Sequence, residues 1–191
     1  MQIILAGIGG QGILFSSKVF SELGLKMGLD IMGSETHGMS QRGGSVIAHL
    51  KLGKFQSPLI RNGAADILYS FEENETYNTL KFLKGGGICF VNLESVDQFN
   101  KRIMKVLKEK EIALRAFDAT GAASKIGSIR SANIVLIGYS VGTGLVAIKY
   151  EDLKYVLELV SREKDLKINL KALELGFQEG KRTSKNPGKS L

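Results

Sequence analysis

The chain has 191 residues, of which 43% are hydrophobic and 24% charged, so it can form one soluble domain with a sizeable core. Its single cysteine, Cys89, excludes an intrachain disulfide and a four-cysteine iron–sulfur cluster on this chain. The formal charge of +7 is unevenly placed, because four basic residues and no acidic residue follow Gly180 and leave only +3 on residues 1–180. We therefore predict a domain over residues 1–180, a flexible basic tail over residues 181–191 and no nucleic-acid interface.

The chain begins with a pattern that predicts a strand, a glycine turn and a helix. Residues 3–6 are a short apolar run typical of buried parallel strands, and apolar residues recur at helical intervals over residues 13–23. Between them, the glycines have the spacing G-x-G-x-x-G, in which the missing Cβ allows a tight turn and close approach of a ligand. The complete turn is Gly7, Ile8, Gly9, Gly10, Gln11 and Gly12. This order is typical of a Rossmann-like βαβ start.

Two interpretations of the glycine turn are open from the residues alone. In the first, the free N–H groups at the helix start bind a dinucleotide phosphate, and Glu35, which follows a short strand at residues 28–33, binds the ribose. In the second, the glycines only form a tight corner between a strand and a helix.

A polar, glycine-rich segment at residues 34–45 is the main candidate for a functional loop. Its candidate site residues are Glu35, His37, Ser40, Gln41, Arg42, Gly43 and Gly44. His37 can act as a base or proton relay, or it can fix the loop by hydrogen bonding, which we favour because no nucleophile or metal-ligand set accompanies it. Arg42 beside two glycines can hold a phosphate or carboxylate, or it can pair with Glu35.

The rest of the chain alternates between strands and helices. We expect strands at residues 46–52, 66–71, 88–92 and 112–117. We expect helices at residues 72–84, 96–107, 132–148, 153–160 and 170–177, and a small-residue helix after Asp118. This alternation predicts a single α/β domain with a Rossmann-like, doubly wound and mostly parallel sheet. The strand at residues 46–52 can be antiparallel, because no helix separates it from the strand before it.

The long apolar segment at residues 132–148 carries no charge, but it is slightly short for a membrane span and contains three glycines. We interpret it as a helix that is buried at a domain or subunit contact. The apolar run at the N-terminus is too short for a secretory signal and lacks a basic start. We therefore expect a cytoplasmic protein without a membrane segment.

No complete catalytic or metal-binding motif is present in the sequence. There are only two histidines, and His49 lies within an expected strand, where a hydrogen-bonded structural role is favoured over metal binding. The sequence has no Walker A lysine and no G-x-S-x-G elbow, and Cys89 is expected to be a buried, unreactive thiol. We therefore assign no metal site, and no catalytic residue beyond the candidate His37.

Three longer motifs resemble the gamma-type domain of the 2-oxoacid:ferredoxin oxidoreductases. They are residues 7–14, 34–46 and 66–72, and shorter matches occur at residues 116–119, 132–138 and 169–176. Within this family, the sequence His-Gly-Met-Ser-Gln-Arg at residues 37–42 is most similar to the small (beta) subunit of the indolepyruvate type. The pyruvate and 2-oxoglutarate branches instead have a proline and an acidic residue before the arginine. The resemblance covers about residues 1–180.

The resemblance implies a subunit of an enzyme of amino-acid catabolism in anaerobic metabolism. Such enzymes decarboxylate a 2-oxoacid with thiamine diphosphate and Mg²⁺, pass electrons through [4Fe–4S] clusters to ferredoxin, and form an acyl-CoA from coenzyme A. In the indolepyruvate type, the large (alpha) subunit carries these cofactors and the small subunit carries none, which agrees with the single cysteine of this chain. The glycine turn is then a corner of the fold rather than a nucleotide site.

The same resemblance implies that the chain is active only in a complex. We expect a heterodimer or a dimer of heterodimers, in which residues 34–45 and the helix at residues 132–148 contact the large subunit. Arg42 would contact coenzyme A or the substrate carboxylate. The alternative is a free-standing oxidoreductase that binds NAD(P) or FAD through the glycine turn and Glu35.

Overall fold

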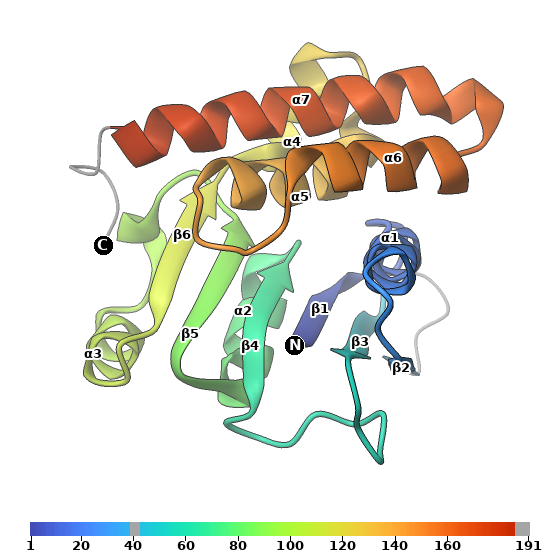
Figure 1. Cartoon of the computed structure of the whole chain (residues 1–191). Coiled ribbons are helices and arrows are strands. Elements are labelled where there is room, and N and C mark those ends of the chain that lie inside the picture. The colour runs from blue at the N-terminus through green and yellow to red at the C-terminus, as the bar shows by residue number, and fades with distance from the viewer. Residues whose placement is uncertain (39–42, 186–191) are drawn as a thin grey trace.

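Six strands form one mixed sheet in the computed structural model, which describes residues 1–38 and 43–185 (Figure 1). The strands are β1 (Gln2–Ile8), β2 (Ile31–His37), β3 (Ser45–Leu52), β4 (Ala65–Ser70), β5 (Leu83–Asn92) and β6 (Ala113–Phe117). Their order in the sheet is β2-β3-β1-β4-β5-β6. β1, β4, β5 and β6 are parallel, whereas β3 is antiparallel to both of its neighbours. The prediction of a mostly parallel α/β sheet with an antiparallel member is confirmed.

Helices cover both faces of this sheet, as in a doubly wound fold. They are α1 (Ile13–Lys26), α2 (Glu73–Thr79), α3 (Lys101–Glu109), α4 (Ala119–Lys125), α5 (Ala132–Gly142), α6 (Tyr150–Val160) and α7 (Glu163–Lys185), with 3-10 turns η1 (Leu80–Phe82), η2 (Val96–Gln98) and η3 (Ile129–Ser131). The core on one face includes side chains of α1 and α4 to α7, and the core on the other includes side chains of α2 and α3. Residues 3–6 of β1 are all apolar because Ile3 and Leu5 enter one core and Ile4 and Ala6 enter the other.

α5 forms a buried layer between the sheet and α7 (Figure 1). Glycines allow the two helices to approach closely: a Cβ on Gly176 would lie 1.9 Å from the Val135 carbonyl oxygen. The predicted buried helix is confirmed, although it ends at Gly142 rather than at residue 148. Because α7 of the same chain covers α5, a contact of the segment 132–148 with another subunit is left only to the exposed residues after Gly142, such as Leu145.

The helix expected at residues 72–84 is shorter than predicted. α2 ends at Thr79, and the chain passes through η1 into β5 at Leu83. The glycines at residues 85–87 therefore lie within a strand and do not end a helix. Gly86 has a φ of 71°, a backbone conformation that favours glycine, so these glycines allow an irregular start to the strand.

The C-terminal ends of two other elements, β2 and α7, also differ from the predictions. β2 continues to His37, so residues 34–37 of the predicted loop belong to a strand. α7 continues to Lys185, beyond the boundary predicted at residue 180, and residues 186–191 lie outside the described part of the chain. None of the helices within the described ranges has both the length and the hydrophobicity that crossing a bilayer requires.

Candidate functional site

The glycine turn between β1 and α1 is closed by the side chain of Gln11. Its Oε1 accepts a hydrogen bond from the Ile8 N–H at 2.9 Å, while the backbone N–H of Gln11 donates to the Ile8 carbonyl at 3.2 Å. A Cβ on Gly7 would lie 2.6 Å from this Oε1, so glycine is required for the side chain to fold back. Gly12 precedes α1 with a φ of 77°, where glycine is also favoured. The predicted turn is therefore present, and its own glutamine fills it.

The start of α5 packs against the same corner through Asn133. Its Nδ2 donates to the Gly12 carbonyl at 3.1 Å and to Ser16 Oγ at 3.0 Å. Asn133 is buried, and a Cβ on Gly12 would lie 2.6 Å from its Nδ2. No motif in the sequence predicts this role. The available signal was a polar residue at the start of an otherwise apolar helix.

Two carboxylates, Glu72 just before α2 and Glu75 within it, hold the corner from the other side. Gln11 Nε2 donates to Glu72 Oε2 at 3.0 Å, and Ser45 Oγ donates to Glu75 Oε2 at 2.6 Å. Glu75 is buried. Glu72 follows β4, so the first hydrogen bond crosses the carboxyl ends of β1 and β4, where the direction of the chain crossovers changes. Doubly wound proteins commonly bind ligands at this position. From the sequence, Glu72 is expected only at the start of a helix, and nothing in the pattern distinguishes Glu75.

The structure brings the glycine turn and the polar segment together through their backbones. The Gly9 N–H donates to the Gly44 carbonyl at 3.0 Å, and a Cβ on Gly9 would lie 3.7 Å from the Gly43 nitrogen. These predicted residues therefore form one corner. Ser40, Gln41 and Arg42 lie outside the described residues, so the pairing of Arg42 with Glu35 stays a prediction.

Glu35 is too far along the sheet to complete a dinucleotide site. It lies on β2 opposite Ala48, which in turn lies opposite Leu5 in the middle of β1. Because β3 separates β2 from β1, Glu35 is two strand spacings, or about 10 Å, from the β1 backbone. His37 is level with Gly7 by the same pairing, and both Glu35 and His37 are exposed.

The chemistry of the corner disfavours an anionic phosphate. The Glu72 carboxylate lies at the switch point, and like charges repel strongly in a partly buried site. Within the described ranges there is also no group of three or more histidine, cysteine, aspartate or glutamate side chains placed to hold a metal ion. The described residues therefore form a hydrogen-bonded structural corner, with no nucleophile–base pair.

The two other reactive side chains considered from the sequence are structural. His49 is buried in β3, and its Nδ1 accepts a hydrogen bond from the Ile60 N–H at 3.2 Å, which confirms the structural role predicted for it. Cys89 is fully buried, as expected, and burial raises the pKa of its thiol, which disfavours the reactive thiolate.

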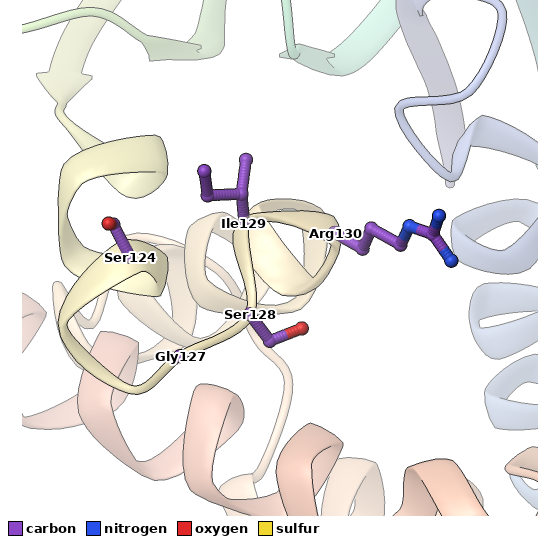
Figure 2. Close-up of a pocket in the computed structure, with 5 residues that line it drawn as sticks. All are labelled: Ser124, Gly127, Ser128, Ile129 and Arg130. Carbon is purple, nitrogen blue, oxygen red and sulfur yellow. The ribbon is translucent and has the colours of Figure 1, made fainter.

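A hollow of about 440 Å³ lies beside the end of α4 and η3 (Figure 2). It is lined by Ser124, Gly127, Ser128, Ile129 and Arg130. Figure 2 shows the Arg130 side chain extending away from Ser124, and Ser128 Oγ is 3.0 Å from Ser131 Oγ. The polar groups do not converge on one point, so the hollow lacks the arrangement of a ligand site.

Comparisons with known proteins agree with the fold and the sequence motifs. A family model described as pyruvate ferredoxin/flavodoxin oxidoreductase matches residues 2–179. The indolepyruvate oxidoreductase subunit IorB of Thermococcus kodakarensis is 32% identical over 192 aligned positions, covering 94% of this chain and 95% of that protein.

Solved structures show the same fold in two settings. The gamma subunit of a keto/oxoacid ferredoxin oxidoreductase from Geobacter sulfurreducens has a TM-score of 0.75 at 22% identity, covering 95% of this chain and 98% of its own. A 2-oxoglutarate:ferredoxin oxidoreductase from Magnetococcus marinus has a TM-score of 0.76 at 21% identity, covering 95% of this chain but only 31% of its own. The fold therefore occurs both as a separate chain and as part of a longer one.

Proposed function

This chain belongs to the pyruvate ferredoxin/flavodoxin oxidoreductase family, and from this premise we propose that it is the small subunit of an indolepyruvate-type 2-oxoacid:ferredoxin oxidoreductase. The observation that carries the proposal is the match to the Thermococcus subunit over nearly the whole length of both chains. The proposed complex converts an aryl 2-oxoacid to an acyl-CoA and reduces ferredoxin. It is a cytoplasmic heterodimer or dimer of heterodimers, and the domain of this chain extends to the end of α7 at Lys185.

The residues of this chain do not fit the cofactors of such a reaction. One fully buried cysteine cannot ligate a [4Fe–4S] cluster, which takes four thiolates. The described residues also include no cluster of three or more histidine, cysteine, aspartate or glutamate side chains. We therefore assign thiamine diphosphate, Mg²⁺ and the clusters to the large subunit, and no step through them to this chain.

The role left for this chain is to bind the large subunit and to shape its active site. We propose that residues 34–45 form the contact, because Glu35 and His37 in its first part are exposed and the Gly9–Gly44 hydrogen bond holds its last part at the switch point. Arg42 would then contact coenzyme A or the substrate carboxylate. Purification of the chain in its native complex tests the assembly, and recovery of the chain without a thiamine-dependent, cluster-bearing partner would contradict it.

Replacement of Arg42 by alanine tests the narrower role within the intact complex. We expect the KM for coenzyme A or for the oxoacid to rise about tenfold or more, because a hydrogen bond to a charged group contributes about 1.5–3 kcal/mol. Steady-state kinetics with each substrate varied in turn measure this. Arg61→Ala is the matched control, since Arg61 is an exposed arginine before β4, at the opposite end of the sheet. Unchanged KM values for both substrates would remove the role of Arg42.

A further inference from the structure

The two edge strands of the sheet differ in how well the described residues cover them. β2 and β6 are the end strands. Four of the seven residues of β2 are exposed, whereas none of the five residues of β6 is. The exposed residues of β2 are Gly33, Glu35, Thr36 and His37, on both faces of the strand. An edge strand without cover presents unpaired backbone groups that can template another strand.

Hydrogen bonds at both ends of the β2–β3 pair identify which backbone groups point outward. The Gly38 N–H donates to the Ser45 carbonyl at 2.7 Å, and the Gly53 N–H donates to the Asp30 carbonyl at 2.8 Å. Antiparallel pairs alternate between hydrogen-bonded and non-hydrogen-bonded residues, and the register between these two ends is unbroken. The even-numbered residues of β2 therefore bond to β3. The odd-numbered residues direct their N–H and carbonyl groups to the open edge: Ile31, Gly33, Glu35 and His37.

β2 also lacks the features with which proteins usually protect an exposed edge. It contains no proline and no lysine, and its only charged residue is Glu35. Its pairing with β3 runs over all seven residues without a bulge. Proline, lysine and bulges are the common means of preventing an edge from pairing with another chain. The edge of β2 is therefore a regular row of donors and acceptors that remains competent to pair.

We infer that the open edge of β2 takes up an extended segment of the large subunit as an additional strand. This inference rests on the proposed function. A row of backbone donors and acceptors is complementary to another extended backbone, as in other cases of strand addition. β2 leads directly into Gly38 and the segment proposed to contact the large subunit, so one continuous interface results. Pairing with a second copy of this chain would instead join two six-stranded sheets, and open twisted sheets rarely exceed about ten strands.

Hydrogen exchange of the backbone amides tests this inference at single-residue resolution. In the full-length chain purified alone, we expect fast exchange at Gly33, Glu35 and His37 and slower exchange at Ser34 and Thr36, whose N–H groups bond to β3. In the complex with the large subunit, the three odd-numbered amides should slow by at least tenfold. Slow exchange of these amides in the chain alone, with dimers present, would overturn the inference in favour of a second copy.

The same experiment separates failure of the inference from failure of the proposed function. A complex that forms without added protection at Gly33, Glu35 and His37 overturns strand addition and leaves the subunit assignment intact. Absence of any complex with the large subunit overturns both.

Proline substitution at Gly33 provides a second test. Proline removes the outward N–H of residue 33 without removing a bond to β3, and it is tolerated in edge strands. The matched control is Gly33→Ala, because a Cβ here meets only the Leu50 side chain and the His49 carbonyl at 3.6 and 3.7 Å. We expect Gly33→Pro to weaken the affinity for the large subunit at least tenfold relative to Gly33→Ala, with similar melting temperatures of the two isolated variants. Equal affinities would overturn the inference.

Discussion

His49 shows at the scale of one residue how a buried titratable group is held in one protonation state. Its Nδ1 accepts the Ile60 N–H, and an imidazole that accepts a hydrogen bond there must lack a proton on that nitrogen. Burial lowers the pKa of His49, and the positive charge of Lys51 lowers it further. Protonation would break the hydrogen bond and bury a charge, so the folded protein favours the neutral ring.

This environment predicts that the free energy of unfolding falls in mildly acidic solution. Between the lowered pKa of folded His49 and the unfolded value of about 6.5, the unfolded chain binds a proton that the folded chain does not. Stability is therefore lost as the pH falls below about 6.5, by about 1.4 kcal/mol for each unit of pKa depression, and the loss stops at the folded pKa. Urea unfolding at pH 8, 6.5 and 5 measures it.

His49→Gln is the control for this prediction, because the glutamine cannot titrate and its side-chain oxygen can accept a hydrogen bond. The variant should be less stable than the natural protein at pH 8 and should approach it as the pH falls. A difference between the two proteins that does not change with pH would contradict the linkage to His49.

At the scale of an element, α7 depends on glycines for its contact with α5. Gly176→Ala would place a Cβ 1.9 Å from the Val135 carbonyl oxygen and 2.8 Å from the Tyr139 nitrogen, both backbone atoms that cannot rotate away. Alanine normally stabilises a helix by about 1 kcal/mol over glycine, but overpacking typically costs about 1–3 kcal/mol or more. We expect a net loss of stability, measured by thermal and urea unfolding.

Lys171→Ala on the exposed side of the same helix serves as the control. It should change stability by no more than about 0.5 kcal/mol, as is usual for surface substitutions. An increase in stability for Gly176→Ala would show that the helices can separate without loss, and would contradict close packing as the reason for the glycine.

Elements with strong local signals were predictable from the sequence, and elements fixed by tertiary contacts were not. The apolar run, glycine turn and amphipathic helix at the N-terminus specify their structures locally. The sequence predicts a loop at residues 34–37, because both faces of β2 are exposed there and no alternation of apolar and polar residues marks the strand. The glycines at residues 85–87 look like a helix stop, although they lie at the start of a strand whose pairing with β4, the preceding strand, fixes its structure.

The candidate site was predictable only in part for the same reason. The pattern identified the glycine turn and the segment ending at Gly44, but it could not show that their backbones bond to each other. It also could not show that Gln11 binds Glu72 or that Ser45 binds Glu75, because each pair joins segments that are distant in the sequence. The sequence therefore does not predict that Gln11, Glu72, Ser45 and Glu75 fix the corner.

At the scale of the whole molecule, the strand order decides against nucleotide binding. Insertion of β3 between β1 and β2 moves Glu35 away from the glycine turn, and the Gln11–Glu72 hydrogen bond closes the crevice between β1 and β4. A dinucleotide would have to break this bond and place its phosphates beside a carboxylate. We therefore predict that calorimetry of the isolated chain with NAD(P) or FAD shows no binding at ligand concentrations up to about 1 mM, equivalent to a binding free energy weaker than about −4 kcal/mol.

Glu72→Gln separates the two causes of this failure, because it removes the charge and keeps a side-chain oxygen that can accept the hydrogen bond from Gln11. If charge alone excludes the phosphate, the variant should gain measurable affinity for the dinucleotide. We expect no measurable binding by this variant either, because Glu35 still lies about 10 Å from the β1 backbone and cannot reach a ribose bound at the turn. Micromolar binding by the unmodified chain would contradict the prediction and restore a free-standing oxidoreductase as the better explanation of the glycine turn.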